Sequence, residues 1–488
     1  MDTLLIVSTI FLPILYGVFT EFIHVQNRKL KCSLLFGVLF LTSVLTILCV
    51  FKVNSSVVLS QITDKLSISF FVDDLSRLFL VVSVLIWMLV GVYAFIYMKH
   101  EENEDRFFGF LLITLGAVIA LELSENLFTM YLSFELITLA SLPLVLHSLK
   151  KDAILAGMKY LFYSVGGAFL ALLGVFYLFS FCENDTFITG GSFILEKAND
   201  SKDILLVVIF LLIVGFGTKA GMYPMHGWLP TAHPVAPAPA SALLSGIIAK
   251  AGVFTIIRVI FYLVGDDFIR GTWVQYAWLS LALLTVFIGS MMAYKENIFK
   301  KRLAYSTVSQ VSYILVGLAL LTPEAFTGAL MQFTFHAIIK NVLFLVAGII
   351  IFKTGCTNVN EFNGIGRKMP ITMWCYTIAS LGLIGIPPTC GFISKWYLAV
   401  GALDSGTYVF EYLVPIILLV SALLTGGYLL PITINGFFKA SEEPIKSTSE
   451  AHPLMFIPLI ILSILIVGFG IFTQPLFDFL TSISSSLI

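Results

Sequence analysis

Long apolar stretches, each followed by a short polar break, repeat from one end of the chain to the other. A helix that crosses the hydrocarbon core of a bilayer needs about 20 mostly apolar residues, and these stretches are long enough. The pattern predicts fourteen transmembrane helices, near residues 3–23, 31–52, 76–98, 107–123, 126–148, 153–181, 203–222, 240–264, 273–294, 302–321, 325–352, 372–402, 411–437 and 454–481. The longest connections between them, residues 53–75 and 182–202, are too short for a separate soluble domain.

The composition supports an all-α polytopic membrane protein. Of the 488 residues, 58% are hydrophobic and 12% are charged, whereas an average soluble domain has about 25% charged residues. A water-facing surface cannot be built from so few charges, which excludes secreted, cytosolic and nucleic-acid-binding proteins. The six cysteines form no CxxC motif or close cluster, so we expect no thiolate-bound metal or iron–sulfur centre. The first apolar stretch follows Asp2 without a basic leader and is read as a retained helix.

The distribution of lysine and arginine predicts the orientation. With the N-terminus outside, the inner connections hold sixteen basic residues and the outer connections hold six. Inner loops of membrane proteins are enriched in lysine and arginine, so both termini are expected on the outer side.

Six basic residues remain for the membrane interior: Lys159, Lys219, Lys250, Arg258, Lys340 and Lys395. A charge at mid-bilayer costs at least about 2.5–3.5 kcal/mol, so each is a candidate functional residue. Lys159 and Arg258 lie near the ends of their stretches, from which a long side chain can reach the membrane surface. For Arg258 a structural role is equally plausible. Lys250 lies near the midplane, flanked by small residues that admit another helix or water.

Two of these lysines lie beside helix breakers. Lys219 precedes a segment with Gly221, Pro224, Gly227 and Pro230, and Lys395 follows the run 385–391. Interrupted helices at membrane depth are tolerated where they line a polar or hydrated cavity. Two such interruptions in corresponding places of two halves indicate a transport site.

One acidic residue lies inside an apolar stretch. Glu135 is within 126–148, and an isolated carboxylate there would take up a proton unless it has a basic partner. We expect Lys219 to be that partner. Glu122 and Glu125 lie at the outer boundary of their stretches, where contact with solvent is the simpler interpretation.

Histidines in the same region could relay protons, because imidazole titrates near neutral pH. His336 and Lys340 are four residues apart and share one helix face, which could join Lys250 to Lys395. The alternative is that His336 is a single buried hydrogen-bonding residue. His226 and His233 flank the break after Lys219 and could serve an inner entrance for protons, whereas His147 is expected at the interface.

The linked motifs resemble the antiporter-like subunits shared by respiratory complex I, Mrp-type cation/proton antiporters and energy-converting membrane hydrogenases. The resemblance covers roughly residues 107–400 and rests on residues 217–233 (GTKAGMYPMHGWLPTAH), 236–246 (APAPASALLSG), 250–252 (KAG), 301–310 (KRLAYSTVSQ), 336–340 (HAIIK) and 385–396 (GIPPTCGFISKW).

The resemblance implies an architecture of about fourteen helices in four parts. These are N-terminal helices 1–3 over 1–106, inverted five-helix repeats over 107–264 (helices 4–8) and 273–437 (helices 9–13), and a C-terminal helix over 454–488. Helices 7 and 12 would be discontinuous. By matching motif, Glu135 would pair with Lys219, Lys250 would be the central lysine, and Lys395 would end the axis. Phe134 stands where the family often has tryptophan before the glutamate.

The residues and the resemblance together predict a proton-carrying axis of Glu135, Lys219, Lys250, His336, Lys340 and Lys395, with His226 near its entrance. A lysine at 395 resembles the D type of Mrp antiporter and the N type of complex I, and run 385–397 is closer to the Mrp and hydrogenase branch. We expect the D-type protein of an Mrp-type Na⁺/H⁺ antiporter, or its hydrogenase equivalent, in a bacterial or archaeal cell membrane. An N- or M-type component of complex I and a stand-alone cation/proton antiporter are the alternatives.

The expected partners are other membrane subunits, the lipid bilayer and protons, with sodium carried by a partner subunit. No nucleic acid, metal or cofactor is expected. The chain carries no recognisable redox centre, so the driving event would be a reaction in a neighbouring subunit or a counter-flowing cation.

Overall fold

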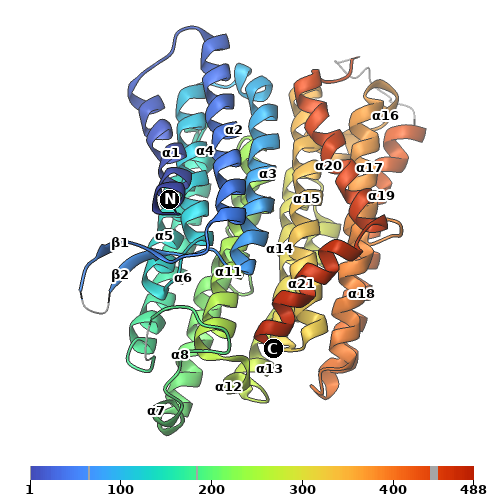
Figure 1. Cartoon of the computed structure of the whole chain (residues 1–488). Coiled ribbons are helices and arrows are strands. Elements are labelled where there is room, and N and C mark those ends of the chain that lie inside the picture. Colours follow the sequence, from blue (N-terminus) through green and yellow to red (C-terminus); the bar gives the residue numbers. More distant parts are fainter. Residues whose placement is uncertain (1, 64–65, 183–184, 440–448) are drawn as a thin grey trace.

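The computed structural model describes residues 2–63, 66–182, 185–439 and 449–488. Long helices run side by side along roughly one direction, and a small β-hairpin lies to one side of them (Figure 1). The N-terminal half contains α1 (Asp2–Phe22), α2 (Arg28–Lys52), β1 (Val57–Gln61), β2 (Ser67–Phe70), α3 (Asp74–Tyr97), η1 (Met98–His100), α4 (Glu104–Glu122), α5 (Leu127–Val145), α6 (Lys151–Leu178), α7 (Leu195–Asp200), α8 (Lys202–Ala220), α9 (Leu229–Val235), α10 (Ala238–Gly246), η2 (Ile248–Lys250), α11 (Ala251–Ile257) and the π-helical η3 (Arg258–Val264).

The second half continues with α12 (Asp266–Ile269), α13 (Trp273–Lys295), α14 (Phe299–Ala319), α15 (Pro323–Thr354), η4 (Val359–Glu361), α16 (Ile365–Lys368), α17 (Pro370–Ile384), α18 (Cys390–Leu403), α19 (Val409–Phe438), α20 (Pro453–Ile471) and α21 (Gln474–Leu487). The predicted helical, polytopic membrane architecture is confirmed.

Eleven helical segments among the described residues are long and apolar enough to cross a membrane. Helices also occupy the other three predicted stretches. α4 has charged residues at both ends, α14 carries a row of serine, threonine and glutamine side chains, and α17 and α18 divide the stretch 372–402 between them. Length and apolarity therefore do not confirm fourteen spans, and that count stays a prediction.

Two further features differ from the sequence expectation. The connection 53–75 forms the antiparallel hairpin β1–β2, and the stretch 454–481 divides at residues 472–473 into α20 and α21. The hairpin packs on the end of α4, where the Phe71 amide donates to the Leu123 carbonyl at 2.8 Å. Because this hairpin lacks a long alternating strand pattern, its short strands were not apparent from the sequence.

The centre of the bundle is formed by α15 and by the segment from α10 to η3. The most apolar 18-residue window of the α10–η3 segment is 100% buried, against 33% for α1, α2, α19 and α20. α10 packs directly against α15. A helix that is apolar all round must be covered by other helices, so these two segments form the core while the outer helices face lipid.

Helix interruptions occur beside both predicted lysines. α8 ends at Ala220 with Gly221 at φ +76°, and α17 ends at Ile384 with Gly385 at φ +90°. Glycine adopts this left-handed conformation without steric cost and therefore ends a helix sharply. Each connection contains a cis prolyl peptide, at Tyr223–Pro224 and Pro387–Pro388. A third interruption, which the sequence did not predict, is the 3₁₀ turn η2 between α10 and α11.

The close packing of α11 against α8 depends on a glycine just after the third interruption. A Cβ on Gly252 of α11 would lie 2.3 Å from the Phe216 carbonyl oxygen of α8 and 3.3 Å from the Lys219 Cβ. Small residues let transmembrane helices approach in this way. Gly252 therefore holds the segment after Lys250 against the helix that carries Lys219.

We expect Gly252→Val to destabilise the fold by about 1–3 kcal/mol, because the added methyl groups must push α11 away from backbone atoms of α8. Denaturant unfolding in detergent measures the change. The matched control is Gly37→Val in α2, where an added Cβ meets nothing within 4 Å. Equal stability of the two variants would contradict the close contact between α8 and α11.

Candidate functional site

Lys219, in the last turn of α8, reaches across to α5. Its Nζ donates to the Phe134 carbonyl oxygen at 3.0 Å and to Thr138 Oγ1 at 2.6 Å, and it lies 4.2 Å from the centre of the Phe134 ring. Glu135 is close enough for its charge to act on Lys219, but no oxygen of Glu135 is within ion-pair distance. Its buried Oε1 has no hydrogen-bond partner in the part of the chain that the structure describes. The two residues are therefore neighbours, while the ammonium is held by a carbonyl and a hydroxyl.

Lys250 ends the 3₁₀ turn η2 and is 1% exposed. Its Nζ donates to the carbonyl oxygens of Ser245, at 3.2 Å, and Gly246. These are the last carbonyls of α10, which lack intrahelical donors because the α-helix stops there. The interruption that the sequence did not predict thus supplies the ligands of the central lysine.

α15 presents Gln332, His336 and Lys340 at intervals of four residues, so the three lie on one helix face. Lys340 is 0% exposed, and its Nζ donates to the Leu303 carbonyl oxygen at 2.9 Å and to Ser306 Oγ. Both ring nitrogens of His336 are buried, and neither has a hydrogen-bond partner among the residues described. The charges of Lys250, Lys340 and Lys395 are all close enough to act on this ring. The structure therefore places three of the predicted lysines near the ring of His336.

Lys395 is half-buried in α18, and its side chain reaches back across the interruption to the end of α17. Its Nζ donates to the last carbonyls of α17, those of Leu383 at 2.5 Å and Ile384 at 2.6 Å. A cation at a helix C-terminus is stabilised by the partial negative charge of these carbonyls. The ammonium also lies 5.5 Å from the centre of the Tyr313 ring.

A hydrogen-bonded chain next to Lys395 was missed from the sequence. Ser394 Oγ donates to Gln332 Oε1 at 2.7 Å, and Gln332 Nε2 donates to Gln310 Oε1 at 2.9 Å. The three residues come from α18, α15 and α14 and are buried. Their positions in the sequence could have indicated them, because Gln332 lies four residues before His336 and Ser394 directly precedes Lys395.

The remaining candidate histidines lie toward the end of the bundle that carries the α9–α10 connection. His226 is half-buried in the connection after α8, where the charge of Lys159 acts on it. His233 is 0% exposed, its ring stacks on Phe344 at 4.7 Å, and the charges of Lys340 and Lys300 act on it. His226 and His233 are therefore beside the lysines rather than bonded to them.

A polar hollow opens beside this group. It has a volume of ≈ 730 Å³, and its lining includes Glu101, His147, Lys150, Asp152 and Lys300. His147 and Lys300 are both buried, although the sequence suggested an interfacial position for the histidine. Burial, with a smaller effect of the Arg106 charge, lowers the pKa of His147 to about 4. The Lys300 ammonium donates to the Ala236 carbonyl oxygen at 2.7 Å.

Arg258 provides the contrast with the lysines. Its Nη1 and Nη2 bind the two oxygens of Asp73 at 2.5 and 2.8 Å, and Nη2 also donates to Ser76 Oγ at 2.9 Å. The Tyr262 ring centre is 4.5 Å from the guanidinium. Asp73 is the N-cap of α3, so this ion pair joins α3 to η3. Arg258 therefore has a structural role and does not extend the axis.

By comparison, none of the four lysines of the predicted axis has such a partner among the described residues. Across the described residues, Lys219, Lys250, Lys340 and Lys395 form no ion pair with a carboxylate within 4.0 Å. Buried charges that serve stability are normally paired, because an unpaired one is costly. These ammonium groups thus combine burial with weak, neutral ligands.

The sequence interpretation of Glu122 is wrong. Instead of meeting solvent at the end of α4, its side chain is 2% exposed and accepts a hydrogen bond from Ser83 Oγ at 2.5 Å. α3 and the β-hairpin cover the end of α4, a contact between distant segments that the local sequence does not reveal.

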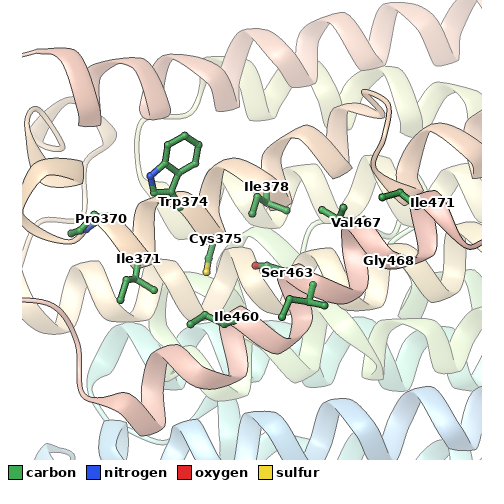
Figure 2. A pocket seen from close by; sticks show the side chains of 11 residues that line it. Pro370, Ile371, Trp374, Cys375, Ile378, Ile460, Ser463, Val467, Gly468 and Ile471 are labelled. Atoms are coloured by element: carbon green, nitrogen blue, oxygen red, sulfur yellow. The ribbon is translucent and has the colours of Figure 1, made fainter.

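An apolar groove on the outside of the bundle is not part of this site. It is a groove of ≈ 1120 Å³ between α17 and α20, lined by side chains such as Trp374, Ile378, Ile460 and Val467 (Figure 2). None of the described residues that line it is charged, and the Trp374 side chain is largely exposed. The groove belongs to the apolar outer surface and lies apart from the lysines.

Comparison with known proteins gives a consistent family. The family described as NADH:quinone oxidoreductase/Mrp antiporter, transmembrane, matches residues 124–425, and the N-terminal family of complex I chain 5 matches residues 61–108. The N subunit of the NADH-quinone oxidoreductase of Desulforudis audaxviator is 30% identical over 83% of this chain and 82% of its own. The D subunit of the Na⁺/H⁺ antiporter of Bacillus subtilis is 27% identical over 85% and 83%.

A solved structure shares the fold over almost the whole chain. A chain of the Mrp complex from Dietzia sp. DQ12-45-1b superposes with a TM-score of 0.84, covering 99% of this chain and 98% of that one at 22% identity.

The Asp73–Arg258 pair gives a test of the structural assignment. We expect Asp73→Asn to destabilise the protein by about 3–5 kcal/mol at neutral pH, because it leaves a buried guanidinium without an anion. Unfolding in detergent measures this loss, with Asp74→Asn as the control at a neighbouring exposed carboxylate. A stability equal to that of the control would exclude a structural role for the pair.

The same pair predicts a pH dependence. Burial alone would raise the pKa of Asp73, but Arg258 lowers it from 3.8 to about 2. The stabilisation is therefore fully present above pH 3.8 and is lost as the pH falls through 2. Between these values the stability difference between the native protein and Asp73→Asn should shrink; a constant difference would contradict the ion pair.

Proposed function

Because the chain belongs to the NADH:quinone oxidoreductase/Mrp antiporter transmembrane family, we propose that it carries protons through a membrane as one subunit of a larger complex. The relatives named above are subunits of such assemblies. We place it in a bacterial or archaeal cell membrane with both termini outside, as the distribution of basic residues favours.

The observation that carries this proposal is the set of four lysines without carboxylate partners among the described residues. A lysine in an apolar interior can give up its proton and become a neutral amine, whereas arginine remains charged. Carbonyl and hydroxyl oxygens accept hydrogen bonds from both the ammonium and the amine. Each lysine can therefore hold or release a proton without losing its place in the structure, as a proton carrier must.

The proposed path begins at the α8–α9 connection. Protons enter past His226 or the polar hollow beside Lys300 and reach Lys219. They then move by way of Lys250 to the face of α15 that carries His336 and Lys340. The interactions of the His336 ring with three lysine charges support this order.

Lys395 is the proposed last member of the path. Ser394, the residue before it, bonds the buried amide of Gln332, which in turn bonds that of Gln310, and this chain can orient water near the lysine. Protons leave from Lys395 toward the opposite side of the membrane.

Glu135 is the proposed switch of the path. Its carboxylate favours a proton on Lys219, and its unbonded Oε1 leaves it free to move. When Glu135 moves away from Lys219, release of the lysine's proton toward Lys250 becomes easier. The driving event is a reaction in a neighbouring subunit or a counter-flowing cation.

We further propose the repeat organisation that the family resemblance implies. One five-helix repeat spans 107–264 and the other spans 273–437, between three N-terminal helices over 1–106 and the C-terminal segment 454–488. Each repeat contains an interrupted helix with a lysine beside the break, Lys219 or Lys395, which supports the assignment; the first repeat also contains the interruption at Lys250.

Two couplings are compatible with this chemistry. Similarity to the D subunit of a Na⁺/H⁺ antiporter favours exchange against a cation, with sodium bound by a partner protein, since protonated lysines cannot ligate it. Similarity to the N subunit of an NADH-quinone oxidoreductase favours the second candidate, a pump module driven by a redox reaction elsewhere in the complex.

Lys250→Arg is the sharpest test of the proton path. We expect proton transport in membrane vesicles to fall at least about tenfold, because arginine keeps the charge but cannot release its proton. Lys250→Ala should have the same effect, and a pH-sensitive dye measures both. The control is Lys295→Ala, at an exposed lysine that ends α13. Native transport by Lys250→Arg in a fully assembled complex would exclude Lys250 as a carrier.

Glu135 tests the proposed switch separately. We expect Glu135→Ala to abolish coupled transport and Glu135→Asp to retain part of it, because aspartate keeps the carboxylate with a shorter reach. Initial rates of proton uptake at equal protein content measure the difference. Equal rates for the two variants would show that the charge of Glu135 is not used.

The composition of the native complex separates the two couplings. We expect an affinity-tagged chain to be isolated with several small membrane subunits and to drive sodium-dependent proton exchange in liposomes. Isolation with flavin- or iron–sulfur-containing subunits, and proton transport only with an electron donor and acceptor, would instead establish the redox-driven pump.

A further inference from the structure

Glu122 and Lys250 line the same small cavity. It is narrow, with ≈ 10 Å³ available to the centre of a water molecule, which is about the space that one water needs. Among the described residues, Glu122 and Lys250 are its only titratable ones; the others that line it are Phe79, Val118, Leu121, Ile247, Ala251, Phe254 and Phe333. Glu122 comes from α4 and Lys250 from η2, far apart in the sequence. An acidic and a basic side chain therefore border one apolar space in the core.

The carboxyl group of Glu122 is incompletely bonded. One oxygen, Oε1, accepts from Ser83 Oγ at 2.5 Å, while Oε2 is buried and has no partner among the described residues. A buried carboxyl oxygen without a donor is costly, so a side chain kept only for structure would have both oxygens bonded. The free oxygen is available to a water molecule in the cavity or to a proton.

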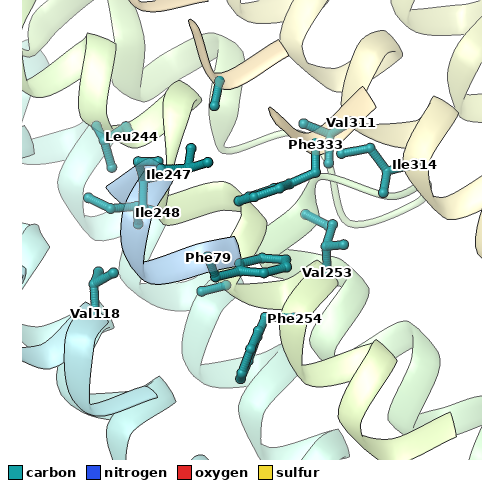
Figure 3. Close-up of a cluster of buried hydrophobic side chains, with 14 of the residues drawn as sticks. Phe79, Val118, Leu244, Ile247, Ile248, Val253, Phe254, Val311, Ile314 and Phe333 are labelled. Carbon is teal, nitrogen blue, oxygen red and sulfur yellow. The ribbon is translucent and has the colours of Figure 1, made fainter. Parts of the chain in front are cut away.

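Three aromatic rings line this cavity together with Lys250. The Phe79 and Phe333 rings stack at 3.8 Å between centres, and Phe254 meets Phe79 edge-on at 5.0 Å (Figure 3). The Lys250 ammonium lies 5.9 Å from the centre of the Phe333 ring. Phe333 thus contacts the lysine and the cavity together, so a change in its rotamer alters the access of water to both.

Glu122 also lies near a surface of the protein. It is the last residue of α4, and three residues later Glu125 accepts a hydrogen bond from Ser56 Oγ at 2.6 Å beside the β-hairpin. The Glu125 amide donates to the Ser69 carbonyl oxygen at 3.2 Å, so the hairpin covers this end of α4. About one helical turn of backbone separates Glu122 from that face.

We propose that Glu122 is a proton-binding site that exchanges protons with Lys250 across this cavity. The inference rests on the proposed function, because it gives the central lysine a second route, toward the hairpin face, besides the one toward Lys395. In the exchange an N–H bond of the Lys250 ammonium breaks and an O–H bond forms on the Glu122 carboxylate. A water molecule in the cavity passes the proton, leaving a neutral amine and a neutral carboxylic acid.

Infrared difference spectroscopy of the intact complex tests the proton-binding site directly. A pH step should produce a C=O stretching band of a protonated carboxyl that is absent from Glu122→Gln and present in Glu125→Gln. Glutamine retains an oxygen that can accept from Ser83 but cannot bind the proton. The same band in Glu122→Gln would overturn the proposal.

Ser83→Ala provides a second variant that leaves the carboxyl in place. Removal of the hydroxyl should shift the position of the band, because the frequency of a carboxyl group depends on its hydrogen bonds. This arm remains informative if Glu122→Gln does not fold. An unshifted band in Ser83→Ala would assign the signal to another carboxyl group and overturn the proposal.

Transport separates failure of this inference from failure of the proposed function. Glu122→Gln should lower the rate of proton transport by at least about tenfold, whereas Glu125→Gln should leave it unchanged. If Lys250→Arg abolishes transport while Glu122→Gln transports normally, the axis stands and the second route is excluded. If Lys250→Arg itself transports normally, the proposed function fails.

Discussion

The structure depends on one constraint: inside a bilayer no water is available to bond a polar group, so each must find a partner within the protein. At the helix interruptions this constraint creates sites where carbonyl oxygens bind lysine ammonium groups. Where α10 and α17 stop, their last carbonyl oxygens lack intrahelical donors, and the ammonium groups of Lys250 and Lys395 bind there. At each break, therefore, the unbonded carbonyl oxygens and the buried ammonium group provide each other's hydrogen bonds.

The constraint also separates the charges that are paired from those that are not. Arg258 and Asp73 form a bidentate ion pair and join two helices, as expected of a buried charge that serves stability. Lys219, Lys250 and Lys340 are as deeply buried but bind only carbonyl and hydroxyl oxygens of the described residues. Such ligands tolerate a neutral amine, whereas a carboxylate would hold the lysine in its charged form.

Much of the helical architecture could be predicted from the sequence because membrane helices must be long and apolar. The breaks after Lys219 and before Lys395 were also visible, since glycine and proline act locally. The 3₁₀ turn at Lys250 was not, because residues 247–251 contain no helix breaker. The division of the last stretch into α20 and α21 was missed although Gly470 and Pro475 flank it, because the apolar run continues across the break.

The sequence by itself determined that the protein spans a membrane and that Lys219, Lys250 and Lys340 lie deep inside it, since both follow from apolar length and position. Only the tertiary structure decided which charges are paired. Glu122 looked like a surface residue until α3 and the hairpin covered it, and Gln332 joined the site only through α14 and α18. Burial and hydrogen bonding of these side chains depend on segments distant in the chain, and local sequence carries no record of those contacts.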